Sequence, residues 1–178
     1  MAVEPHLVLE IPDPSVVLLV GPAGAGKTTF ARRHFGGDEV LSSDAFRALV
    51  SGDEADQRAT SRAFAMLHRE LVRRCARRLL SVVDATNLED HARLTIVRRA
   101  TNAGLPTVVL VLDVPLRTAL ARNRLRAGRT VAEAIVRRQR AQLDALLALG
   151  RLEHEGHEVV VLLDPVAADG VTIARRPW

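Results

Sequence analysis

Residues 21–28 constrain the fold of this chain more than any other segment. They read glycine, four residues, glycine, lysine and threonine, and they lie between a run of β-branched and leucine residues at 15–20 and a segment with helical periodicity. A glycine-rich curl between a strand and a helix turns successive backbone amides toward phosphate oxygens, and the helix N-terminus adds a favourable dipole. This segment, called the phosphate loop below, therefore predicts a triphosphate-binding site formed by Gly21, Pro22, Ala23, Gly24, Ala25, Gly26, Lys27 and Thr28, with the adjacent Thr29.

Lys27 is the only lysine in the chain, and arginine occupies the other 24 basic positions. An ammonium group reaches between two phosphates as a compact charge, where a planar guanidinium fits poorly. We therefore expect Lys27 to contact the β and γ phosphates of ATP and to act in catalysis. Thr28 is expected to place its hydroxyl on Mg²⁺, which prefers hard oxygen ligands. ATP and Mg²⁺ are thus the expected cofactors.

Short apolar runs alternate along the chain with segments of helical periodicity. Strands are expected at 15–20, 39–42, 80–84, 107–112 and 158–163, and helices at 26–34, 45–51, 55–78, 88–103, 116–127 and 131–149. This alternation predicts an α/β fold with a parallel five-stranded sheet sandwiched by helices, in one domain over 1–178 with a core at 15–165. Gly104 and Gly150 are expected to end two of the helices. We interpret the tail 166–178 as a short edge strand plus a loose end.

Asp44 and Arg47 follow the second expected strand, one helical turn apart and therefore on one face. In a parallel sheet, ligands gather beyond the carboxyl ends of the strands, which is where these residues lie. A carboxylate there can take a proton from an attacking hydroxyl, and an arginine beside it can hold a substrate anion and keep the carboxylate ionised. Helix capping by Ser43 or Asp44 is the structural alternative, and it is compatible with catalysis.

Asp84, Thr86 and Asn87 follow the third expected strand at the same rim. They place a carboxylate beside two hydrogen-bonding side chains, which makes them candidate substrate-binding residues. Asp84 could also orient water around Mg²⁺. Alternatively, Asp84 caps the helix that starts near residue 88.

Arg122 and Arg126 lie four residues apart on one face of an expected helix, and Arg129 follows beyond Gly128. An arginine-rich helix, a glycine and a second helix fit a lid that closes over a triphosphate and neutralises charge during transfer. Arg122 and Arg126 are therefore candidate catalytic residues, and these two together with Arg129 are candidate ATP ligands. The alternative is a solvated basic face, which is also our interpretation of the seven arginines within 55–78.

Four segments together resemble the kinase domain of polynucleotide 5′-hydroxyl kinases, including the bacterial module otherwise found fused to phosphatase and ligase modules. They are the phosphate loop, Ser-Asp-Ala-Phe-Arg at 43–47, Asp-Ala-Thr-Asn at 84–87, and Leu-Asp-Val-Pro at 112–115 with the arginines that follow. Many nucleotide-binding proteins share the phosphate loop, whereas the second and third segments in this order are more specific. The resemblance implies a P-loop kinase-type fold with an arginine-rich helical lid.

By this resemblance, Asp44 would be the general base on the 5′-hydroxyl of DNA or RNA, and Arg47 would hold the neighbouring phosphate of the acceptor. The lysine and threonine of the phosphate loop and the lid arginines would act on ATP, with Arg126 and Arg129 as rivals for the second lid position. A small-molecule or toxin-like kinase shares the same loop and is a second possibility. A non-catalytic ATP-dependent switch or partner-binding module is a third, but such a switch needs no substrate base like Asp44.

Composition bounds the partners. The chain is 48 % apolar and 26 % charged, as soluble globular proteins are, and its net charge of +4 favours a polyanionic partner such as nucleic acid 5′-hydroxyl ends. Four phenylalanines, one tryptophan and no tyrosine leave few side chains to stack on bases. No apolar run approaches the roughly 20 residues that cross a bilayer, and the N-terminus lacks a secretory pattern, so we expect a cytoplasmic protein without a membrane partner. A nucleic acid repair role would need separate phosphatase or ligase proteins.

Overall fold

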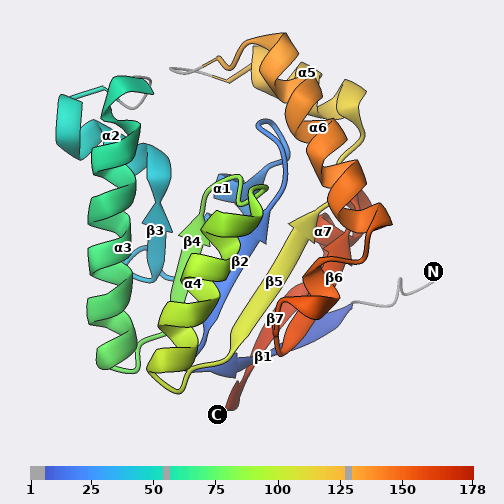
Figure 1. Ribbon diagram of the computed structural model, residues 1–178. Helices are drawn as coiled ribbons and strands as arrows, with labels where there is room; N and C mark the ends of the chain where they lie inside the picture. Colours follow the sequence, from blue (N-terminus) through green and yellow to red (C-terminus); the bar gives the residue numbers. More distant parts are fainter. Residues whose placement is uncertain (1–6, 54–56, 127–129) are drawn as a thin grey trace.

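The computed structural model describes residues 7–53, 57–126 and 130–178, which form a central sheet with helices packed on both faces (Figure 1). Five parallel strands lie in the order β3–β4–β2–β5–β6. Their bounds are β2 Val16–Val20, β3 Val40–Ser42, β4 Ser81–Asp84, β5 Thr107–Leu112 and β6 Val159–Leu163. Each strand matches its expected range to within one residue at either end, so the predicted α/β fold with a parallel five-stranded sheet is confirmed.

Helices connect these strands. Their bounds are α1 Lys27–His34, α2 Ser43–Ser51, α3 Thr60–Ala76, α4 Asp90–Asn102, α5 Leu116–Arg124, α6 Glu133–Ala148 and α7 Pro165–Gly170, with short 3₁₀ turns η1 Gln57–Ala59 and η2 Leu152–His154. Gly104 and Gly150 follow α4 and α6 with φ angles of 65° and 55°, and they end these helices as expected. Among the described residues, no helix is both long enough and apolar enough to cross a membrane.

Strand β2 is buried along its whole length and divides the apolar interior in two. Because side chains of a strand alternate between the faces of a sheet, Val17 and Leu19 pack toward α1, whereas Val16, Leu18 and Val20 pack toward α3 and α4. A strand that is covered on both sides reads as a continuous apolar run, which is the pattern seen at 15–20.

A second, two-stranded sheet pairs the two ends of the described chain. Strand β1, Val8–Asp13, lies parallel to β7, Thr172–Pro177. The sequence pattern predicts no strand at β1, and it predicts a short edge strand and a loose end for the tail. The tail instead forms α7 and then β7, which joins β1 and not the central sheet. Ile11 and Val171 are almost fully buried where this small sheet packs on the core.

The carboxyl ends of the five central strands open on one rim of the sheet because all five run parallel. In Figure 1, α2 and α5 stand on opposite sides of this rim, and the loop between β2 and α1 lies between them. Residues that follow β2, β3, β4 and β5 are therefore brought together there from four separate parts of the chain.

Candidate active site

The phosphate loop leaves β2 at Gly21, whose amide donates a hydrogen bond to the carbonyl oxygen of Thr86 at 3.1 Å. Gly24 has a φ of 80°, and a Cβ atom there would lie 2.1 Å from the carbonyl oxygen of Ala119 in α5. The loop therefore passes so close to α5 that only glycine fits at this position. Helix α1 begins at Lys27, within the last residues of the loop, so the amides of its first turn face the space that the loop encloses.

Lys27 is buried at the base of this loop. Its ammonium group donates to the carbonyl oxygens of Gly21 and Pro22 at 2.9 and 2.8 Å. Burial lowers the pKa of Lys27 to about 8, and the carboxylates of Asp84 and Asp44 oppose that shift. The charge thus lies among the loop's own backbone oxygens, within reach of an incoming phosphate and of both rim carboxylates.

Thr28 and Asp84 meet across the rim. The Thr28 hydroxyl donates to Oδ2 of Asp84 at 2.8 Å, and Asp84 is 4 % exposed at the end of β4. A hydroxyl and a carboxylate are two hard oxygen ligands, and Mg²⁺ in such sites completes its shell with water and substrate phosphates. Among the described residues no group of three acidic, histidine or cysteine side chains gathers to hold a metal. The pair fits Mg²⁺ bound jointly with a triphosphate.

Asp44 lies between two arginines from opposite sides of the rim. Its Oδ1 accepts from Nη1 of Arg47 at 2.6 Å, and its Oδ2 accepts from Nη2 of Arg126 at 2.8 Å. Helix α2 begins at Ser43, two residues earlier than expected, and its cap is Ser42, whose hydroxyl oxygen accepts from the Ala45 amide at 3.4 Å. Capping by Ser42 leaves the Asp44 carboxylate directed at the two guanidinium groups.

The candidate lid arginines separate in the structure. Arg122 on α5 extends over the phosphate loop and donates to the carbonyl oxygen of Ala25 at 3.4 Å. Arg126 lies just beyond α5 and contacts Asp44 instead. Arg129, the rival for the second lid position, lies outside the described residues. The contacts thus place Arg122 beside the phosphate loop and Arg126 beside Asp44.

Asn87 has a structural contact set. It adopts a positive φ of 49°, and its side-chain amide donates to the carbonyl oxygens of Leu19 and Val83 at 2.8 and 3.2 Å. We therefore expect Asn87 to shape the rim by joining β2 to β4, with Thr86 beside it half-buried. This assignment differs from the direct substrate contact expected from the sequence.

Arg93 supports the segment after β4 that contains Asn87, and this role was not recognised from the sequence. It is 0 % exposed and donates to the carbonyl oxygen of Asn87 at 2.9 Å. Its remaining donors bind Glu155 and Asp90, both at 2.7 Å. A buried arginine persists only when its donors are satisfied, and here the partners come from three segments. In the sequence, Arg93 was indistinguishable from the many surface arginines.

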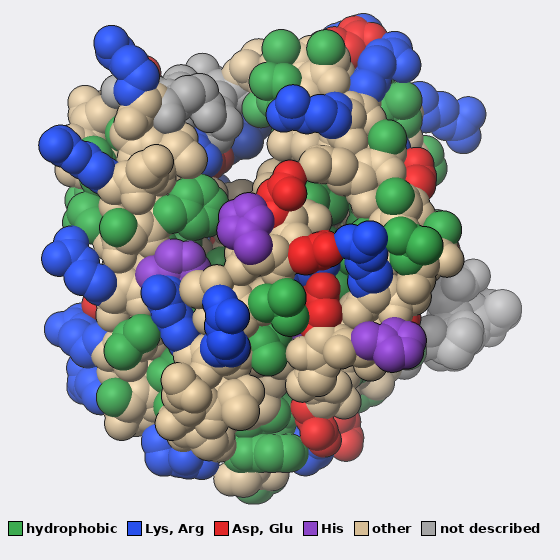
Figure 2. Space-filling view, viewed as in Figure 1, with side chains coloured by type: hydrophobic (Ala, Val, Ile, Leu, Met, Phe, Trp, Pro, Cys, Tyr) green, Lys and Arg blue, Asp and Glu red, His purple; other side chains and the backbone are tan. Residues whose placement is uncertain are grey.

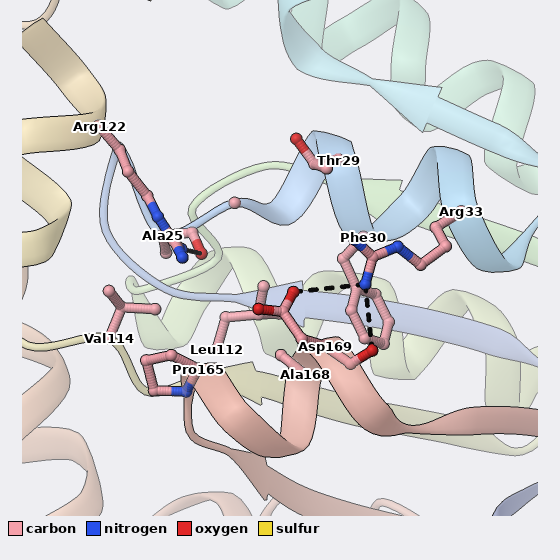
Figure 3. Close-up of a pocket in the computed structure, with 11 residues that line it drawn as sticks. Ala25, Thr29, Phe30, Arg33, Leu112, Val114, Arg122, Pro165, Ala168 and Asp169 are labelled. Atoms are coloured by element: carbon pink, nitrogen blue, oxygen red, sulfur yellow. Dashed lines mark hydrogen bonds and ion pairs between the residues drawn. The ribbon is translucent and has the colours of Figure 1, made fainter. Parts of the chain in front are cut away.

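A pocket of about 230 Å³ adjoins the phosphate loop (Figure 3). Phe30, Val114 and Pro165 provide apolar walls, and Arg122 lies over the entrance to the loop. On the far side, Nη1 of Arg33 binds both a carbonyl and a carboxylate oxygen of Asp169 at 3.3 Å; neither residue of this pair was singled out from the sequence. A pocket with apolar walls and arginines in its lining has the chemistry to hold a nucleotide base.

Gln139 ties α6 to the phosphate loop. Its side-chain oxygen accepts a hydrogen bond from the Ala23 amide at 2.8 Å. One of the amides expected to face phosphate is therefore held by the helix that follows the lid arginines. Nothing in the local sequence distinguished Gln139, because the contact joins positions 116 residues apart.

Comparison with known protein families identifies the domain. The sequence model of a family described as an AAA domain matches residues 16–147. The chain belongs to this AAA domain family. The match begins with β2 and ends near the end of α6, so it includes the phosphate loop, the rim residues and the arginines on both sides. No curated protein matches the sequence significantly.

Solved structures share the fold of this AAA domain. A chain of the Pnkp1/Rnl/Hen1 RNA repair complex aligns with a TM-score of 0.66 and 22 % identity over 78 % of this chain. This chain spans about half, 47 %, of that one. A sugar kinase from Janibacter sp. HTCC2649 aligns with a TM-score of 0.56 and 23 % identity over 85 % of both chains. A chain of the PezAT toxin-antitoxin system of Streptococcus pneumoniae aligns with a TM-score of 0.59 and 14 % identity over 89 % of this chain and 71 % of that one.

These identities show the fold alone, and that fold is the one of P-loop kinases. The prediction of a P-loop phosphotransferase fold is confirmed. A fold of this type binds a nucleotide, and its neighbours include kinases of small molecules.

Proposed function

We propose that this protein is an ATP-dependent polynucleotide 5′-hydroxyl kinase, which transfers the γ-phosphate of ATP to 5′-hydroxyl ends of DNA or RNA. One observation carries the proposal. The Asp44 carboxylate, 19 % exposed, is held between Arg47 and Arg126 at the same rim as Lys27 and Thr28. A base, an anion-binding arginine and a phosphate loop are the three elements that transfer to an alcohol next to a phosphate requires.

The chemistry follows from these positions. Asp44 accepts the proton of the attacking 5′-hydroxyl, whose oxygen bonds to the γ-phosphorus while the bond to the bridging oxygen of ADP breaks. Lys27 moves its charge from the loop carbonyls to the β and γ phosphate oxygens, and Arg122 covers the same phosphates. Bound at Thr28 and Asp84, Mg²⁺ would neutralise charge on the β and γ oxygens.

Arg47 favours a nucleic acid acceptor. Its side chain is 7 % exposed and paired with Asp44, so the guanidinium group is held in place beside the base before an acceptor arrives. An oriented guanidinium beside the base suits an acceptor that carries a phosphate near its hydroxyl, as a polynucleotide 5′ end does. The likeness to a chain from an RNA repair complex supports the proposal at the level of fold. A repair role would bring separate phosphatase or ligase proteins as partners.

A small-molecule kinase is the second candidate. The likeness to a sugar kinase extends over 85 % of both chains, so no large part of the fold favours a polynucleotide acceptor over a sugar. Asp44 would serve as base in either reaction. Arg47 separates them, because a neutral sugar has no anion for it to bind.

Transfer of label decides between the candidates. The protein is incubated with γ-labelled ATP, Mg²⁺ and 5′-hydroxyl oligonucleotides of DNA and of RNA, with the 5′-phosphorylated forms as controls and a panel of sugars in parallel. We expect label on the 5′-hydroxyl oligonucleotides alone. Label on a sugar and none on any oligonucleotide would replace the proposal by the second candidate. ATP binding without transfer to either would favour the non-catalytic switch.

A further inference from the structure

The segment that contains α3 holds a concentrated positive charge. Residues 57–78 include seven arginines and one glutamate, a net charge of +6, whereas the whole chain carries +4. Figure 2 shows basic side chains in blue along the edge of the molecule that α3 forms in Figure 1. The rest of the protein is therefore slightly acidic on balance, and the basic character is local.

Four of these arginines form one line, called the α3 stripe below. Arg62, Arg69, Arg73 and Arg77 are spaced by seven, four and four residues, which places them on one side of the helix, and all four are exposed. The opposite side packs into the core through Ala63, Leu67, Leu71 and Cys75. From Arg62 to Arg77 the stripe extends about 22 Å at the helical rise. It therefore faces solvent along its whole length.

Acidic neighbours do not neutralise most of this charge. Within the described parts of the chain, Arg62, Arg69 and Arg77 have no acidic side chain at ion-pair distance, and Arg73 pairs with Glu70 at 3.0 Å. Helix α6 has the opposite arrangement. There Arg137 pairs with Glu133 and Arg140 pairs with Asp144. An ordinary solvated helix surface resembles α6 more than α3.

The α3 stripe lies on a helix that adjoins the candidate acceptor site. Helix α2, which carries Asp44 and Arg47, packs against α3 and reaches it through η1. Resting on the proposed function, we propose that the α3 stripe binds the sugar-phosphate backbone of the single-stranded polynucleotide whose 5′ end lies at Asp44. With one phosphate per 3.4 Å of a stacked strand, the stripe faces about six nucleotides.

Two properties follow from this chemistry. Arginine contacts to phosphate carry no sequence information, so the stripe favours long acceptors without favouring a sequence. The chain also has few aromatic side chains to stack on bases, so the phosphate charge of the nucleic acid is the main feature through which it can bind a strand. Acceptor length, and not acceptor sequence, should therefore control the affinity.

The test compares acceptors of two lengths. The variant R62Q/R69Q/R77Q removes three stripe charges, and R32Q/R117Q/R138Q removes the same number from exposed positions on α1, α5 and α6. With a 5′-hydroxyl 20-mer, we expect the stripe variant to raise KM about tenfold and to lower the slope of log affinity against log salt by about 2. With a 5′-hydroxyl dinucleotide, KM and kcat should match the wild type. The control variant should have the wild-type KM and kcat with both acceptors.

Other results would overturn the inference. An equal rise of KM for both acceptors would mean that the stripe shapes the catalytic site. A KM for the 20-mer that stays at the wild-type value would mean that the stripe is a solvated surface or one that faces a protein. Binding of a 5′-phosphorylated 20-mer, measured by fluorescence anisotropy, separates this inference from the proposed function. If the wild type phosphorylates no oligonucleotide, the proposed function fails. If it phosphorylates both lengths and the stripe variant binds the strand normally, the inference alone fails.

Discussion

At the scale of single residues, Asp44 receives guanidinium groups from two distant parts of the chain. Arg47 lies one turn away on the same helix, whereas Arg126 lies 82 residues further along. Each contact orients the carboxylate, and the second spans the rim from the α5 side to the α2 side. In the proposed reaction, Arg126 therefore lies beside the base that the acceptor hydroxyl approaches.

We expect Asp44→Asn to lower kcat by about 10²–10⁴, the usual contribution of a general base, and to leave the affinity for ATP close to that of the wild type. An amide keeps the size of the side chain but cannot accept the hydroxyl proton. The measurements are single-turnover transfer and equilibrium binding of ATP. An equal loss of both would assign Asp44 to the architecture of the site.

Lys27 predicts a pH dependence of ATP binding. Burial lowers its pKa to about 8, so the ammonium that attracts phosphate is fully formed only below that pH. We expect the affinity of the free protein for ATP to be constant up to pH 8 and to fall by about tenfold per pH unit above it, until the higher pKa of the bound state is reached. Titration calorimetry from pH 6.5 to 9.5 measures this affinity. The control Lys27→Met should bind ATP weakly, with an affinity that does not change with pH. A wild-type profile that stays flat would contradict the assignment.

At the scale of elements, the phosphate loop is fixed by what packs behind it. Gly24 lies against the backbone of α5, Gln139 of α6 holds the Ala23 amide, and Arg122 contacts the Ala25 carbonyl. Helix α5, which carries Arg122, and helix α6, which follows the candidate lid arginines, thus set the shape of the loop. Movement of α5 or α6 would be transmitted to the amides that face phosphate.

Two glycine substitutions test this packing. Gly24 and Gly52 have similar φ angles of 80° and 77°, but a Cβ at Gly52 meets no atom of the described residues within 4 Å. Gly52→Ala should therefore cost only the strain of its φ angle, about 1 kcal/mol in the free energy of unfolding. Gly24→Ala should cost a further ~1–3 kcal/mol from the clash with Ala119 and should weaken ATP binding, which Gly52→Ala leaves intact. Urea denaturation and ATP titration check both, and equal effects of the two substitutions would contradict the close approach.

At the scale of the whole molecule, the two ends of the described chain stabilise each other. Strand β7 pairs with β1, and Arg175 of β7 contacts Asp13 of β1 and Glu39 before β3. The small sheet packs Ile11 and Val171 against the core that also contains α1. Its position is away from the rim, so its contribution is to stability more than to the geometry of the site.

Removal of residues 171–178 should therefore lower the free energy of unfolding by at least ~2 kcal/mol, because Val171 is lost and Ile11 loses its cover. Removal of Trp178 alone, which is half exposed, should change it little. Thermal unfolding of both truncated proteins gives the comparison. A long truncation that melts with the wild type would show that the β1–β7 pair is dispensable.

The parts of the fold that were predictable have local causes. Buried parallel strands read as apolar runs, helix ends at Gly104 and Gly150 were marked by glycine, and the phosphate loop combines both signals. Strand β1 was missed because its sequence, Val-Leu-Glu-Ile-Pro-Asp, mixes apolar residues with two acids and a proline. Its partner is more than 150 residues away, and no local pattern indicates such a pairing.

The sequence alone determined the phosphate loop, the α/β fold and the residue types along the rim, because each depends on spacing within a few residues. It could not decide which of 24 arginines would reach which carboxylate. Only the tertiary structure joined Thr28 to Asp84, Asp44 to Arg126 and Gln139 to Ala23, across 56, 82 and 116 residues. The physical reason is that parallel strands bring their carboxyl ends to one rim, and contacts between loops from different strands are set by packing of the whole chain.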